Sequence, residues 1–143
     1  MTMLAEFFSP LQVSASGMRA ERTRLDVAAT NLANARTTRT PEGGPYRRRR
    51  VIFETMLNET MDKDPREFRW MGVRVAEISL DYTTPFNTVD DPEHPGQYIQ
   101  YPNVEPHSEM VDLMDASRAY EANAAAFKIS RDMMRQAVEL GRA

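Results

Sequence analysis

Hydrophobic residues recur every seven positions at both ends of the chain, and this spacing predicts two helical arms. The column in the N-terminal arm, residues 1–36, contains Leu4, Leu11, Met18, Leu25 and Leu32. The column in the C-terminal arm, residues 108–143, contains Leu113, Tyr120, Phe127 and Met134. One narrow apolar column per helix is typical of a coiled-coil seam. An antiparallel helical hairpin packed on a small core fits the same pattern, and the spacing does not choose between them.

Small and polar side chains accompany each seam. Ala15 and Ala29 in the first arm, and Ala116 and Ala137 in the second, would let a partner helix approach closely. Asparagines on a helix seam fix the register of pairing at some cost in stability. The seam and asparagine positions together are the predicted subunit-interface residues: Leu11, Met18, Leu25, Leu32, Asn31, Asn34, Leu113, Tyr120, Asn123, Phe127 and Met134. A lone seam has nothing to bury against, so each arm needs a partner helix.

Proline and glycine predict a different structure between the arms. Eight of the nine prolines and four of the six glycines lie within residues 36–107. Such punctuation breaks helices and favours turns and short strands. The predicted fold class is therefore α+β, with a helical arm over 1–36, an extended loop and small β-rich middle domain over 37–107, and a second helical arm over 108–143.

Three short segments of this middle domain have strand character. Val51–Glu54 and Gly72–Tyr82 are predicted strands, and Tyr98–Tyr101 is a predicted short edge strand within an otherwise extended loop. The apolar alternation of the second strand slips by one residue near Ala76 and Glu77. A β-bulge at that point would keep the apolar side chains on one face.

The composition of the 143-residue chain excludes several kinds of site. It has no cysteine, which removes disulfides, thiolate metal sites and cysteine nucleophiles, and its two histidines disfavour a multi-histidine metal site. The sequence contains no glycine-rich phosphate loop and no Ser/His/Asp arrangement. No apolar run is long enough to span a membrane, and the first residues lack the features of a cleaved secretory signal. We therefore expect no enzymatic activity, no cofactor, no metal and no small-molecule substrate.

Charge is divided unevenly along the chain. Residues 1–50 carry nine arginines against four acidic residues, whereas the whole chain has 18 basic and 21 acidic residues. The run Arg47–Arg50 is a candidate phosphate-binding patch. However, arginines on a strand alternate between faces, no aromatic residues interleave with them, and the isoelectric point is about 5.4. We expect a solvated or subunit-facing strand and no nucleic acid; the alternative is a helical adaptor that binds an anionic partner through Arg47–Arg50.

Two clusters of acidic residues are candidates for a metal site or an acid/base site. Asp90, Asp91, Glu93 and His94 place carboxylates and an imidazole close together, but their spacing matches no common metal motif and the flanking prolines mark a surface turn. The carboxylates at the start of the C-terminal arm, beginning at Glu109, suit the positive end of a helix dipole.

Four segments of the chain resemble one protein family. Ser14–Ala20 and Asn31–Ala35 resemble the SGMxA and NLANAxT signatures of bacterial flagellar rod and hook proteins. Thr37–Glu54 and Tyr101–Asn123 resemble, more specifically, proximal-rod subunits of the FlgC type. The resemblance covers nearly the whole chain. The family usually has a DPGHP-like loop, and here Asp91–Pro95 carries Glu93 instead of glycine.

The resemblance implies a structural subunit of the bacterial flagellar basal body, in the proximal rod. Such subunits are exported by the flagellar type III apparatus without a cleaved signal. They polymerise through their terminal helices, which the resemblance implies pair largely between subunits. The product is the periplasmic drive shaft, which transmits torque and encloses the export channel. The implied partners are copies of the chain itself, rod proteins of the FlgB, FlgF and FlgG types, the basal-body protein FliE at the rod base, and the export apparatus.

Overall fold

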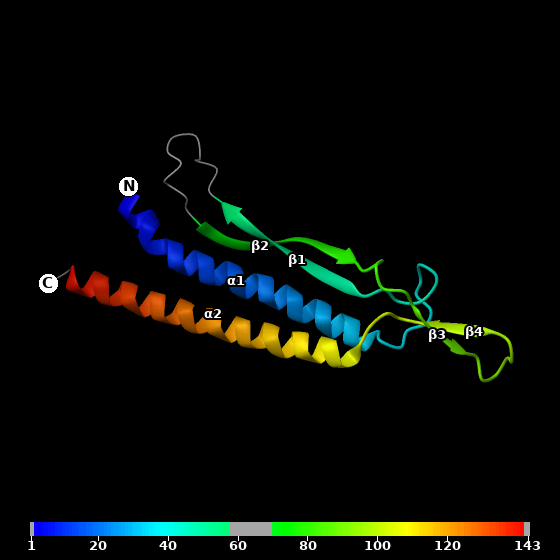
Figure 1. The fold of residues 1–143 in the computed structure, drawn as a ribbon. Coiled ribbons are helices and arrows are strands. Elements are labelled where there is room, and N and C mark those ends of the chain that lie inside the picture. Colours follow the sequence, from blue (N-terminus) through cyan, green and yellow to red (C-terminus); the bar gives the residue numbers. More distant parts are fainter. Residues whose placement is uncertain (1, 58–69, 142–143) are drawn as a thin grey trace.

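The computed structural model describes residues 2–57 and 70–141, with side chains for residues 10–56 and 71–141. Two long helices, α1 (Thr2–Ala33) and α2 (Pro106–Leu140), enclose the middle of the chain in sequence. They lie side by side and antiparallel, so that both ends of the chain are at the same end of the molecule (Figure 1). The predicted α+β class is confirmed. Leu4, in the N-terminal seam, lies outside the described side chains.

Helix α2 begins where the sequence permits a sharp start. Glu105, in an extended conformation with φ −96° and ψ 108°, precedes Pro106. Proline suits the first turn because its missing N–H would have no partner inside the helix. Glu109, also in the first turn, has its charge near the positive end of the helix dipole.

The strands form two separate two-stranded antiparallel sheets. Strand β1 (Arg49–Leu57) pairs with β2 (Trp70–Leu80), and β3 (Asn87–Asp90) pairs with β4 (Tyr98–Tyr101). In the first sheet Ile52 lies opposite Glu77 and Phe53 lies opposite Val75, so Ala76 is the extra residue of a bulge. The predicted bulge is confirmed.

The second sheet confirms the Tyr98–Tyr101 strand but corrects the loop expected before it. Its partner β3 has four exposed residues, so it lacks the alternation of buried and exposed positions that marks a strand in sequence. The cross-strand pairing, from Asn87 opposite Tyr101 to Asp90 opposite Tyr98, holds it in place.

The two arms pack on each other within one chain, and α1 also packs on the first sheet. Helix α1 contacts both α2 and β2. The heptad seams are only partly covered by these contacts, and their pairing with neighbouring subunits stays a prediction. The buried face of α1 consists of small or polar residues such as Ser16, Ala20, Ala28 and Asn31. The heptad residues Leu11, Met18, Leu25 and Leu32 flank that face and are half-buried.

The core is small and rich in polar groups. Among the described residues the buried apolar ones are few: Ala20, Ala28, Tyr46, Val104 and Ala116. Buried polar or charged residues are as prominent: Ser14, Ser16, Asn31, Asp81, Asn103 and Glu109. Neither helix contains, over its described residues, a stretch apolar and long enough to cross a bilayer.

Candidate functional site

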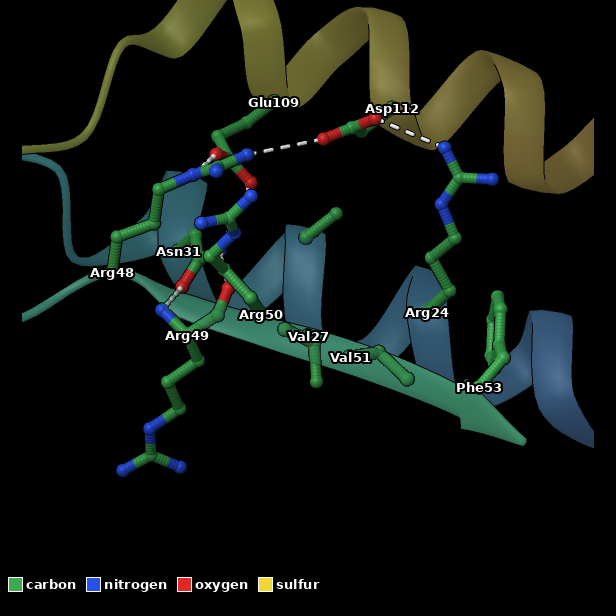
Figure 2. Close-up of a pocket in the computed structure, with 11 residues that line it drawn as sticks. Arg24, Val27, Asn31, Arg48, Arg49, Arg50, Val51, Phe53, Glu109 and Asp112 are labelled. Carbon is green, nitrogen blue, oxygen red and sulfur yellow. Dashed lines mark hydrogen bonds and ion pairs between the residues drawn. The ribbon is translucent and has the colours of Figure 1, made fainter. Parts of the chain in front are cut away.

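A cluster of buried and half-buried polar side chains joins the end of α1, the start of α2 and the segment that enters β1 (Figure 2). We call it the polar junction and define it by Asn31, Tyr46, Arg48, Glu109 and Asp112. A cavity of about 300 Å³ lies against it, lined mostly by charged and polar side chains, with Val27, Val51 and Phe53 as apolar parts of its wall. The junction is where three segments far apart in sequence are fixed to one another.

Asn31 is the centre of the junction. Its Nδ2 donates to the Glu109 Oε2 at 3.0 Å and to the Arg49 carbonyl at 2.9 Å. Its Oδ1 accepts the Arg49 backbone N–H at 2.9 Å and the Tyr46 hydroxyl at 2.8 Å. Both polar atoms of the amide are therefore satisfied, as a fully buried side chain requires.

Glu109 is a carboxylate with 1% of its surface exposed. Arg48 Nε donates to its Oε1, while Asn31 Nδ2 donates to the other oxygen. Arg48 also donates through Nη2 to Asp112 at 3.1 Å, and Arg24 approaches the same carboxylate from the opposite side at 3.0 Å (Figure 2). A buried charge is tolerated only when it is paired and hydrogen-bonded in this way.

Tyr46 completes the junction as a neutral donor. Burial raises the pKa of its hydroxyl, with the positive charge of Arg49 acting against the shift and the negative charge of Glu109 adding to it. The phenol therefore stays protonated at neutral pH and keeps its hydrogen bond to Asn31.

A second buried amide, Asn103, ties the junction to the end of β2. Its Oδ1 accepts the Arg48 backbone N–H at 3.1 Å, and its Nδ2 donates to the Asp81 and Thr84 carbonyls at 3.3 and 3.2 Å. The Asp81 carboxylate accepts hydrogen bonds from the backbone N–H and hydroxyl groups of Thr83 and Thr84. These bonds, those from Thr83 foremost, lower the pKa of Asp81 to about 2.

Two close approaches fix α1 between α2 and β2. The Ser16 hydroxyl oxygen accepts the Val73 backbone N–H at 3.0 Å, and a Cβ at Gly72 would lie 2.0 Å from that oxygen. On the neighbouring face of α1, a Cβ at Gly17 would lie 2.8 Å from the Asn123 amide. The consecutive pair Ser16–Gly17 thus lets two elements approach one helix.

The predicted interface residues occupy three kinds of position. Asn31 lies in the polar junction, Asn123 packs on Gly17, and Asn34 donates to the Thr30 carbonyl at 2.9 Å. The heptad residues of α1 are half-buried at the edge of the helix pair, as are Leu113, Phe127 and Met134 of α2. Tyr120 is 38% exposed. The structure of one chain brings the seams together but leaves much of their surface uncovered.

Sequence reasoning missed the partners in the junction. Glu109 and Asp112 carry the acidic pattern of a helix start, which conceals their pairing with Arg48 and Arg24. A buried tyrosine and a single inward arginine in a run of four give no periodic signal. The sequence signal for these residues was that Asn31, Asn103 and Glu109 all lie in segments that resemble the family signatures.

The four side chains of the run Arg47–Arg50 do not act together as one patch. Arg48 turns inward to Glu109, whereas Arg47 stacks on the rings of Tyr82 and Phe86. The adaptor alternative is therefore not supported. Within the described residues, no group of three or more His, Asp or Glu side chains is arranged to hold a metal ion.

Comparison with known proteins places both arms in one class. Residues 11–39 match the family model of the flagella basal body rod protein, and residues 96–140 match that of the flagellar basal body rod FlgEFG protein C-terminal region. These matches contain Asn31 and Glu109, the two sides of the bond between the arms.

Whole-length relatives agree with these matches. The flagellar basal-body rod protein FlgC of Borreliella burgdorferi is 41% identical over 93% of this chain and 96% of its own length. The FlgC protein of Bacillus subtilis is 40% identical over 94% and 98%, and that of Aquifex aeolicus is 36% identical over 95% and 98%.

Proposed function

The chain belongs to the FlgC family of flagellar basal-body rod proteins, and we propose that it polymerises through its terminal helices into the proximal part of the rod. As a member of that family it is a structural subunit of the flagellar basal body, which assembles with other rod and basal-body proteins. The finer proposal is that the rod built from it transmits torque and encloses the export channel. No catalytic role is proposed.

The observation that carries the proposal is the polar junction. It joins the family signatures of both arms in one buried cluster, through Asn31, Arg48 and Glu109. A cluster that holds two helices and a sheet in a fixed arrangement suits a load-bearing subunit, because its groups have partners inside the chain. The helix surfaces outside the cluster then remain available for neighbours.

Those helix surfaces are apolar and uncovered. On α2, several large apolar side chains have 43% or more of their surface exposed: Met110, Val111, Met114, Ile129, Met133, Val138 and Leu140. Exposed apolar surface of this extent marks protein contacts. We propose that neighbouring subunits cover it together with the half-buried heptad columns, residues 11–32 and 113–134.

The proposed arrangement divides the chain by function. Residues 1–36 and 108–143 form the polymerising arms near the channel, and residues 37–107 face outward. The proposed neighbours are further copies, rod proteins of the FlgB, FlgF and FlgG types, and FliE at the rod base. We also propose export by the flagellar type III apparatus without a cleaved signal and a periplasmic position of the rod.

Deletion of the gene, followed by electron microscopy of basal bodies and a motility assay, tests the proposal. We expect membrane rings without rod or hook, and loss of swimming that the wild-type gene restores. Complete basal bodies and normal swimming in the deletion strain would contradict it.

A further inference from the structure

The strongest charge contrast outside the polar junction lies at the end of the molecule away from both termini. From residue 75 to residue 108 the chain has six acidic residues and no lysine or arginine. Asp90, Asp91 and Glu93 belong to the turn that joins β3 to β4, which we call the acidic turn, residues 90–97. This hairpin projects from the body of the molecule (Figure 1).

The acidic turn is held in shape by one of its own carboxylates. Asp91 Oδ1 accepts the Glu93 backbone N–H at 2.9 Å, and its Oδ2 lies 3.0 Å from His94 Nδ1. The Asp91 backbone N–H donates to the Gln97 carbonyl at 2.9 Å. Asp90 and Glu93 are exposed on this ordered turn.

The strands behind the turn present apolar surface to solvent. Val89 is 51% exposed and Tyr98 is 69% exposed. A hairpin of two strands is only marginally stable in water by itself. An additional contact on this surface would therefore stabilise it.

A groove of complementary character lies at the base of the same hairpin. It has a volume of about 400 Å³, and its walls include Tyr46, Arg47, Arg49, Tyr82 and Phe86. Glu42 stands in the wall as well. We call it the arginine groove.

The two guanidinium groups of the groove are positioned by aromatic rings. The Arg47 Cζ lies 4.6 Å from the centroid of Tyr82 and 4.2 Å from that of Phe86, and the Arg49 Cζ lies 5.9 Å from that of Tyr46. Figure 2 shows the Arg49 side chain directed away from Glu109. Among the described residues, neither guanidinium forms an ion pair, whereas Arg24, Arg48 and Arg74 do. Stacked arginines retain in-plane N–H donors for a carboxylate.

We propose that the arginine groove of one copy receives the acidic turn of a second copy, with Asp90 and Glu93 facing Arg47 and Arg49. The groove cannot receive the turn of its own chain: Phe86 lines it, and the four residues of β3 hold the turn roughly 13 Å farther away. Because the two surfaces differ, the contact is heterologous and repeats from copy to copy. The inference rests on the proposed function only in requiring copies to be neighbours.

Cysteine cross-linking tests this contact directly, since the chain contains no cysteine of its own. Glu42→Cys in the groove wall and Gln97→Cys in the turn are combined in one chain, expressed in the deletion strain. Oxidation of isolated basal bodies should give a ladder at multiples of 16.4 kDa. Each single-cysteine variant is the control and should give at most a dimer. If Glu42→Cys abolishes swimming, Pro45→Cys, which also lines the groove, replaces it.

Charge reversal in the cross-linking background tests the ion pairs. Arg49→Glu should lower the ladder yield by about threefold or more, as expected for a partly exposed charge pair. Adding Glu93→Arg to the same chain should restore it, because every copy then carries both reversed surfaces. Arg36→Glu, at an exposed arginine outside the groove, is the matched control and should leave the yield unchanged.

Two outcomes would overturn the inference and leave the proposed function intact. Assembled rods without a ladder would show that groove and turn are not in contact. A cross-linked product whose mass is not a multiple of 16.4 kDa would show that a different rod subunit occupies the groove. Failure of the proposed function would instead appear as complete basal bodies in the deletion strain.

Discussion

The Asn31 side chain uses both its amide donors and its carbonyl oxygen inside the protein, and its partners belong to two other segments of the chain. This one side chain satisfies several buried polar groups at once, so the stability of the fold depends strongly on it. Its removal leaves a buried carboxylate, a buried hydroxyl and a backbone N–H each short of one bond. The cost is dominated by the groups left behind.

Asn31→Ala is therefore expected to lower the free energy of unfolding by about 3 kcal/mol. Asn34→Ala is the matched control, because Asn34 is half-buried and bonds only to Thr30 and Thr37 near it in sequence. It should cost about 1 kcal/mol. Urea denaturation of the purified proteins measures both values. Equal losses in the two variants would contradict the central role of Asn31.

Asp81 gives the protein a pH dependence in acid. Its folded pKa is about 2, below the ordinary value of 3.8, because Thr83 and Thr84 donate to its carboxylate. The stabilisation is present above pH 3.8 and is lost as pH falls through 2.

Asp81→Asn should thus be less stable than the wild type at pH 7. The difference should shrink as pH falls from 4 to 2, because the wild type then loses its own charge-dependent bonds. Thermal unfolding at a series of pH values checks this. A difference that grows toward pH 2 would assign the effect to another group.

At the scale of the elements, helix α1 contacts β2 on one face and α2 on the adjacent face, and each close contact is made at a glycine. Gly72 has φ +112° and lies against Ser16, whereas Gly17 lies against the amide of Asn123. The sequence identified the helices, both strands of the first sheet, the strand Tyr98–Tyr101 of the second sheet and the bulge at Ala76. It did not identify these close approaches, because a missing side chain carries no periodicity.

Gly72→Ala should destabilise the protein by about 2–3 kcal/mol, since it adds a clash with Ser16 to the strain of a positive φ. Gly43→Ala separates the two effects: Gly43 has φ +91° and nothing within 4 Å of its added Cβ. It should cost about 1 kcal/mol. Denaturation midpoints compare them. Equal losses of stability in the two variants would mean that the clash with Ser16 contributes nothing.

The half-buried seam of α1 leads to a prediction about assembly. Leu25→Asp should abolish swimming and rod formation while the protein is still expressed, because neighbours would have to bury a charge. Gln12→Asp, at an exposed position of α1 outside the seam, is the control and should have the smaller effect. Immunoblots, motility agar and electron microscopy of basal bodies give the readouts. A swimming Leu25→Asp strain would contradict the prediction.

The whole molecule has an uneven distribution of contacts along its length. The polar junction and Asn103 connect the entry to β1 and the end of β2 to the start of α2, whereas residues 135–140 of α2 are exposed throughout. The sequence predicted the two arms and the α+β class from periodicity. It could not predict that the arms pair within one chain. A heptad seam fits a partner helix from the same chain and one from a neighbouring subunit equally well.

Hydrogen exchange of the purified chain should follow this gradient. Amides of residues 109–123 should be protected at least about tenfold more than those of residues 135–140, which lack buried neighbours. Mass spectrometry of peptic peptides resolves the two segments. Uniform protection along α2 would indicate that the exposed end is covered, for example by self-association.

The bond between Asn31 and Glu109 also determines how the helix pair responds to shear. A heptad seam looks the same after a slip of seven residues, so apolar contact alone resists separation of the arms better than sliding. Such a slip would place Asn31 opposite Ala116 and strip the Glu109 carboxylate of its amide partner. The junction therefore fixes the register of α1 on α2, and a force that slides one helix along the other must first break its hydrogen bonds.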